Sequence, residues 1–312
     1  MQFFGLKPVA ASLLFAAAAG ILAAQSTNMT PQEQANLKFA LDWWREGFVA
    51  NHSEAVSKYL ADDMIQHNPN APNGNATLKQ MIGRRTPVNP IPATIPPQNM
   101  PAKAFAKGDF VVLVWERQGK DPADPSKTYK YNDFDLFRIQ NGNVREHWDS
   151  AVKNAAEGSG AASDTGHQTT IPPSSANTGK LSSQEQKNLE IATREMKDVL
   201  QYGHVEVAKE VMAPGYIQHN PNVPGGREGF VNFFGPRAKP EPIKAEWKAA
   251  PALTLVSGDL VFFMQERKGK EPADASQTYN YNTFDLLRVD NGMIQEHWDA
   301  ARKAAPPPQT GR

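Results

Sequence analysis

Apolar side chains recur at helical spacing near the start of the chain, and a second such segment follows about 150 residues later. The first pattern consists of Leu37, Leu41, Trp44 and Phe48, and the second of Leu189, Met196 and Val199. Intervals of three, four and seven residues place these side chains on one face of a helix. Shorter helical patterns follow at 53–61 and 205–213, and further helical turns at 76–83 and 226–235.

The second part of each segment has the patterns of strands. Residues 110–117 and 260–267 are apolar runs, and residues 128–140 alternate between apolar and polar positions before Asn141-Gly142. Asn-Gly between two such runs is a strong hairpin signal, and residues 143–151 form the return strand. Helices followed by an antiparallel sheet predict the α+β class.

The chain carries this arrangement twice. Between the stretches 116–151 and 266–301, 23 of the 36 positions are identical, and the string IQHNPN occurs at 65–70 and again at 217–222. A period this long exceeds that of solenoid repeats and indicates two whole domains. We predict domains over 30–152 and 182–303, a flexible Gly/Ser/Pro-rich linker over 153–181 and a disordered tail over 304–312.

The first residues have the pattern of a secretory signal. Lys7 precedes an apolar run over 9–24, after which the chain becomes polar. This predicts a signal peptide over 1–24 and a secreted or periplasmic protein, with an N-terminal membrane anchor as the alternative. The 33 basic and 33 acidic side chains balance, which argues against nucleic acid or a membrane surface as the main partner. Without cysteine, disulfides and thiolate chemistry are excluded.

Strand parity brings histidine and aspartate to one face of each predicted sheet. The predicted acid–base residues of the first copy are His67, Asp135, His147 and Asp149, and those of the second are His219, Asp285, His297 and Asp299. Tyr131, Asn68, Tyr281 and Asn220 are the predicted pocket-lining residues. Carboxylates are costly to bury in a plain core, whereas a pocket can use their shifted pKa values.

Each of these features also has a structural interpretation. The histidine of IQHNPN can brace a turn rather than line a pocket. Asp135 and Asp285 can form ion pairs with arginines, and Trp148 and Trp298 suit a core or interface better than a substrate platform. Two histidines and a carboxylate are the ligand types of some metal sites, but their spacing matches no metal signature. We therefore predict no metal and no cofactor.

Taken together, YIQHNPNVPGG (216–226) and FDLLRVDNGMIQEHWD (284–299) resemble the SnoaL-like polyketide cyclases of the nuclear-transport-factor-2-like superfamily. The resemblance implies two cone-shaped α+β barrel domains, each with a curved sheet around a deep pocket. Because the family's cyclases use a pocket aspartate and histidine on enolisable carbonyl compounds, it implies Asp299 with His297, and Asp149 with His147. Relatives commonly dimerise through the outer sheet face, so the resemblance also implies an intramolecular pseudo-dimer with Trp148 and Trp298 near the contact.

Three functions remain open at this point. The first is a cofactor-independent lyase, isomerase or cyclase that acts on a small carbonyl compound. The second is a secreted protein that binds a small molecule without turning it over, and the third is a structural pseudo-dimer with filled pockets. Fold alone does not choose among them. The segment GGREG (225–229) is closer to the family pattern than its counterpart, so we expect the second copy to carry any single active site.

Overall fold

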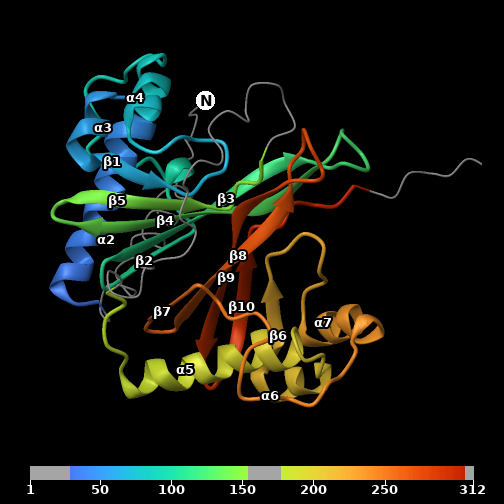
Figure 1. The fold of residues 1–312 in the computed structure, drawn as a ribbon. Coiled ribbons are helices and arrows are strands. Elements are labelled where there is room, and N and C mark those ends of the chain that lie inside the picture. Colours follow the sequence, from blue (N-terminus) through green and yellow to red (C-terminus); the bar gives the residue numbers. More distant parts are fainter. Residues whose placement is uncertain (1–28, 154–176, 306–312) are drawn as a thin grey trace, which may run out of the picture.

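Two domains with the same order of strands follow one another in the computed structural model, which describes residues 29–153 and 177–305 (Figure 1). Domain 1 contains α2 (Pro31–Trp43), the π-helix η1 (Trp44–Val49), α3 (Glu54–Tyr59), β1 (Leu60–Gln66), α4 (Ala76–Gly83), η2 (Pro97–Asn99), β2 (Lys103–Lys107), β3 (Phe110–Lys120), β4 (Thr128–Gln140) and β5 (Asn143–Asp149). Domain 2 contains α5 (Ser183–Thr193), the π-helix η4 (Arg194–Val199), η5 (Val205–Val207), α6 (Ala208–Val211), β6 (Met212–Gln218), α7 (Arg227–Phe234), η6 (Gly235–Arg237), β7 (Leu253–Ser257), β8 (Leu260–Lys270), β9 (Thr278–Asp290) and β10 (Met293–Asp299).

Each domain has one five-stranded sheet. The strand orders are β1-β5-β4-β3-β2 and β6-β10-β9-β8-β7. The predicted α+β class is confirmed, with two corrections. The sheets are open rather than closed into barrels, and they are mixed rather than antiparallel, because β1 pairs parallel with β5 and β6 with β10. The seven residues that end at the glutamine of each IQHNPN string form an edge strand that the sequence interpretation had missed.

Local sequence signals account for the ends of several elements. Thr30 and Ser182 each accept a hydrogen bond at the start of the first helix of their domain, and a glutamate three residues later completes the capping box. Asn141 and Gly142 adopt φ values of 53° and 74° between β4 and β5. These positive values suit a two-residue hairpin turn, in which asparagine and glycine tolerate the left-handed region.

Each sheet separates two apolar layers. In domain 1 the inner face, with Leu113, Phe137 and Val144, packs against the helices through Leu37, Ala40 and Trp43. The outer face is a shared core with domain 2, which includes Phe105, Phe134, Trp148, Phe262, Phe284 and Trp298. The two domains therefore form an intramolecular pseudo-dimer through their sheets, with both tryptophans in the contact as expected.

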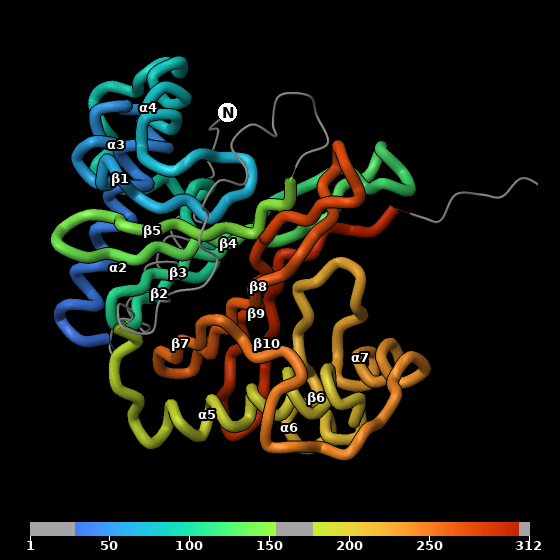
Figure 2. The backbone as a smooth tube through the Cα atoms, viewed as in Figure 1, coloured from blue at the N-terminus to red at the C-terminus, as the bar shows by residue number. Residues whose placement is uncertain are grey.

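Polar contacts run across the same boundary at its edges. Strand β2 lies against β7, and β4 against β10 (Figure 2). Lys107 Nζ donates to Glu185 Oε1 over 2.9 Å, and both side chains are buried. The segments that follow β5 and β10 exchange partners, since Lys153 pairs with Glu271 and Lys303 with Asp121. The exchange is symmetrical, because the four residues occupy equivalent positions in the two copies.

Three sequence predictions fall wholly or largely outside the described residues. These are the signal peptide over 1–24, most of the linker over 153–181 and most of the tail over 304–312. Within residues 29–153 and 177–305, none of the helices has the length and apolar character needed to span a bilayer.

Candidate active site

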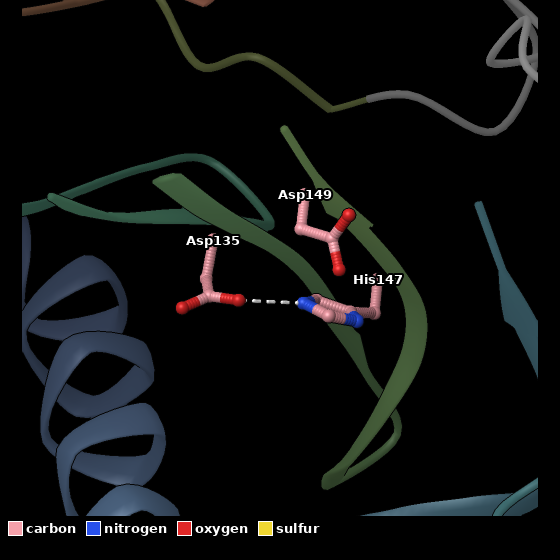
Figure 3. Close-up of side chains that lie close together, drawn as sticks. All are labelled: Asp135, His147 and Asp149. Carbon is pink, nitrogen blue, oxygen red and sulfur yellow. Dashed lines mark hydrogen bonds and ion pairs between the residues drawn. The ribbon is translucent and has the colours of Figure 1, made fainter. Parts of the chain in front are cut away.

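Asp135, His147 and Asp149 of domain 1 lie close together on the inner face of the sheet (Figure 3). Asp135 on β4 is the register partner of Asp149 on β5, and His147 precedes Asp149 by two positions, so all three point to one side. His147 Nε2 lies 2.8 Å from Asp135 Oδ1. One polar atom from each of the three residues lies within 4.8 Å of the others. This spacing could surround a cation, and it equally suits proton transfer among the three groups.

The cluster borders a cavity of about 570 Å³ between the helices and the sheet of domain 1. The three cluster residues line it together with Trp43, Trp44, Phe48, Leu60, Trp115 and Phe137. A volume in this range accommodates a small organic ligand, and a mostly apolar lining with a few converging polar groups is typical of ligand pockets. The site thus combines titratable groups with an aromatic wall.

The IQHNPN string supplies hydrogen bonds to the cluster through Gln66 and Asn68. Gln66 Oε1 lies 3.0 Å from His147 Nδ1 and also accepts from the Asn68 backbone N–H over 3.2 Å. Because that backbone donor requires an oxygen at this place, His147 Nδ1 is the donor to Gln66. On its other side, His147 Nε2 faces the Asp135 carboxylate, which also accepts a hydrogen bond. Because both ring nitrogens face acceptors, a proton on each is favoured, and the ring is then the charged imidazolium.

The surroundings shift the pKa values of these groups. Burial alone would lower the pKa of His147, but the hydrogen bond to Asp135 and the charges of both aspartates raise it. Burial raises the pKa of Asp149, partly offset by His147, while Asn68 Nδ2 donates to Asp149 Oδ2 over 2.6 Å. Trp115 Nε1 donates to Asp135 Oδ2 over 2.5 Å. The site therefore pairs an imidazole and a carboxylate that both have raised pKa values.

His67 and His219 do not belong to these clusters, which corrects the sequence interpretation. His67 lies on the other side of the sheet, where its ring stacks on Trp148 at 4.3 Å and its Nε2 lies 3.1 Å from Glu146 Oε2. His219 repeats this arrangement with Trp298 at 4.5 Å and with Glu296. The strand preceding each histidine turns its ring away from the cavity and toward the glutamate and tryptophan of the neighbouring strand.

Domain 2 contains the equivalent cluster of Asp285, His297 and Asp299. His297 Nε2 lies 3.1 Å from Asp285 Oδ1, and Asn220 Nδ2 donates to Asp299 Oδ2 over 2.8 Å. On the remaining side of the imidazole, Glu195 Oε1 lies 3.7 Å from His297 Nδ1. His297 Nδ1 also lies 3.5 Å from Gln218 Nε2. This side of His297 therefore faces both an amide and a buried carboxylate, whereas His147 Nδ1 faces the Gln66 amide.

Glu195 is a site residue that sequence reasoning missed. It lies on η4 at the position that Trp43 occupies in domain 1, and it is fully buried. Burial raises the pKa of Glu195 to about 7, with His297 opposing the rise. Burial would lower the pKa of His297, but Asp285 and Glu195 outweigh it and raise this pKa to about 9. Alignment of the first helices of the two copies places Glu195 opposite Trp43. This exchange is the sequence signal from which Glu195 could have been identified.

The substitution Glu195→Gln is expected to lower the pKa of His297. The amide keeps the shape of the side chain but removes one of the three negative charges that favour the imidazolium. A nuclear magnetic resonance titration of the His297 ring measures the effect. Glu190→Gln, an exposed change on α5, is the matched control. A His297 pKa that stays equal or rises in Glu195→Gln would contradict the assigned pair.

The four predicted lining residues are divided between the two domains. Asn68 borders the cavity of domain 1, and Tyr131 lies near its edge beneath Arg302, whose guanidinium is 3.5 Å from the ring centroid. Asn220 contacts the cluster of domain 2 through Asp299. Tyr281 packs against Tyr279 with ring centroids 5.8 Å apart. The asparagines are therefore in direct contact with the clusters, and the tyrosines lie further along the strands.

Comparison with known proteins relates the second domain to a known family. Residues 193–297 match the family model of the SnoaL-like domain. No curated protein matches the chain by sequence. A solved SnoaL-like protein from Jannaschia sp. CCS1 is 20% identical, covers 38% of this chain and 88% of its own, and has a TM-score of 0.29. A nuclear-transport-factor-2-like protein of unknown function from Mesorhizobium loti is 19% identical, with coverages of 39% and 97% and a TM-score of 0.28.

The family match and the internal repeat together identify the fold. The match covers most of domain 2, from the end of α5 to β10. Domain 1 has the same strand order, and its stretch 116–151 shares 23 of 36 residues with domain 2. Domain 2 therefore matches the SnoaL-like domain, and domain 1 repeats its strand order and much of its sequence.

Proposed function

We propose that domain 1 binds a small, largely apolar carbonyl compound and catalyses its enolisation, as in aldol-type cyclisation or isomerisation. The observation that carries the proposal is the cavity of about 570 Å³ with Asp135, His147 and Asp149 in its wall. Such chemistry needs a base next to an acidic C–H and a donor for the oxygen that becomes negative. Both kinds of group are present, and neither depends on a cofactor.

Asp149 is the proposed base. It lines the cavity, and its raised pKa makes the carboxylate a stronger proton acceptor than a solvated aspartate. The hydrogen bonds from Asn68 and from the Ala151 backbone N–H hold its two oxygens in place. An oriented carboxylate lowers the entropic cost of reaching the transition state.

His147 is the proposed proton donor. Its ring is held between Gln66 and Asp135, and the hydrogen bond and charge of Asp135 raise its pKa, which favours the protonated form. A charged imidazole beside Asp149 stabilises negative charge that develops on the carbonyl oxygen. Trp115 orients Asp135 in turn, so Asp135 is a positioning residue for His147.

Domain 2 is better suited to stabilising the pseudo-dimer than to catalysing a reaction. Its imidazole lies between Asp285 and Glu195, and a pKa of about 9 keeps it charged over the physiological range. Three acidic side chains around one histidine hold its proton tightly, which opposes proton transfer. We therefore propose domain 1 as the active copy, whereas the sequence pattern favoured the second copy.

Deuterium exchange tests the proposed function without knowledge of the natural substrate. Aryl and cyclic ketones exchange their α-protons slowly near neutral pH, and exchange in deuterium oxide is followed by proton nuclear magnetic resonance. The wild-type protein is expected to accelerate exchange of at least one ketone above the buffer rate. Binding of a ketone in the cavity without any acceleration would replace catalysis with the non-catalytic binding function.

We also propose that the protein is exported and loses residues 1–24. The apolar run behind Lys7 supports this proposal. N-terminal sequencing of the protein recovered from its native host tests it. A mature N-terminus close to residue 25 is expected, whereas a chain that retains residues 1–24 in the membrane fraction would indicate an anchor.

A further inference from the structure

A cationic side chain at the cavity of domain 1 comes from domain 2. Arg302 follows β10, and its Nη2 donates to Asp133 Oδ1 over 2.7 Å. Its guanidinium covers the ring of Tyr131, and its side chain is 54% exposed. Because Arg302 also lines the cavity, the wall of domain 1 is completed by the other domain.

A second arginine reaches the same carboxylate. Arg117 Nε lies 3.5 Å from Asp133 Oδ2, and both residues line the cavity. Two guanidinium groups thus share one carboxylate, which leaves a net positive charge at this end of the cavity. The contact with Asp133 uses one nitrogen of Arg302, whose guanidinium has five N–H donors. Donors therefore remain for an anionic group.

The second copy serves as an internal comparison. The residues equivalent to Arg302 and Asp133 are Val152 and Thr283. There Arg267, the counterpart of Arg117, donates to Thr283 Oγ1 over 3.4 Å. An ion pair between the domains is therefore present at the cavity of domain 1, and uncharged residues stand at the equivalent positions of domain 2. A pair required only to join the domains has no reason to differ between the copies.

We propose that Arg302 is a specificity-determining residue which, together with Arg117, binds an anionic group on the ligand of domain 1. The ligand class is then an apolar carbonyl compound that carries a carboxylate or a similar anion. Residues 133 and 135 are two positions apart on β4, so the anion lies about 7 Å from the acid–base cluster. This inference rests on the proposed function, because it names the substrate class of the same cavity.

Two naphthalene probes that differ in charge test the proposal. The anionic probe is 1-anilinonaphthalene-8-sulfonate, and the neutral probe is N-phenyl-1-naphthylamine, which has the same ring system. Dissociation constants come from fluorescence titrations of the full chain at low salt. Arg302→Val is expected to weaken binding of the anionic probe about tenfold and to leave the neutral probe unchanged. Arg302→Lys keeps the charge and is expected to restore part of the loss.

Asp133→Thr is expected to change the affinity for the anionic probe in the opposite direction. Removing the carboxylate frees both guanidinium groups, so the anionic probe is expected to bind more tightly than to the wild type. If the pair only joins the domains, Arg302→Val and Asp133→Thr shift both probes in the same direction. Both substitutions introduce the side chain found at the equivalent place in the other copy, and thermal melts confirm that the variants are folded.

The outcomes separate the two proposals. Opposite shifts for the anionic probe alone support anion recognition by Arg302. Binding of both probes without dependence on Arg302 overturns this inference and leaves the ligand site of domain 1 in place. If neither probe binds, the cavity takes no apolar ligand, and both the proposed function and this inference are wrong.

Discussion

Asp149→Asn is expected to reduce ketone deuterium exchange by about 10²–10⁴-fold, the usual contribution of a positioned general base. Asparagine keeps the shape of the side chain and can still contact Asn68 and the Ala151 backbone, but it cannot accept a proton at neutral pH. The affinity for a neutral ketone is expected to change little, because the aromatic wall of the cavity is unaltered.

Asp299→Asn is the matched control for this prediction. It removes the equivalent carboxylate of domain 2, which accepts from Asn220 and Ala301 as Asp149 does from its own partners. Exchange is expected to continue at the wild-type rate. If Asp299→Asn abolishes exchange while Asp149→Asn does not, the active copy is domain 2.

Phe134→Ala is expected to lower the free energy of unfolding by about 3–5 kcal/mol, as is typical for a buried phenylalanine. Phe134 lies in the core shared by the domains, where its ring stacks on Phe284 with centroids 5.6 Å apart. The deleted ring leaves a cavity between two sheets, and neither sheet can close it without moving the other. Phe284→Ala should have a similar effect, because it removes the opposite half of the same stack.

Denaturant unfolding, followed by tryptophan fluorescence, measures this loss. Val88→Ala, at an exposed position, is the control and is expected to change stability by less than about 0.5 kcal/mol. If Phe134→Ala and Val88→Ala unfold alike, the sheet-to-sheet contact contributes little and the domains are independent.

The outline of each domain was predictable because its patterns are strong. Alternation along 128–140 and the Asn-Gly turn gave the β4–β5 hairpin, and the same parity correctly placed His147 and Asp149 on one face with Trp148 on the other. Edge strand β1 was missed for a physical reason. Its sequence LADDMIQ does not alternate, and it pairs in parallel with a strand about 80 residues away, which no local pattern reports.

The candidate site was predictable only in part. The His-x-Asp pair and Asp135 come from adjacent strands, so register and parity suffice to group them. His67 was misplaced because a turn follows β1, and the direction of a side chain at the end of a strand depends on tertiary packing. Arg302 could not be predicted, since it reaches domain 1 from the other domain. Glu195 required comparison of the two copies, because a lone glutamate in a helix is usually solvated.

The response of two histidines to a ligand tests most directly whether the ligand site lies in domain 1. The ring signals of His147 and His297 are assigned by nuclear magnetic resonance, and 1-anilinonaphthalene-8-sulfonate is then added. We expect the His147 signals to shift with probe concentration, because this ring borders the cavity, and the His297 signals to stay in place. A shift of His297 with an unchanged His147 would contradict this expectation and assign the ligand site to domain 2.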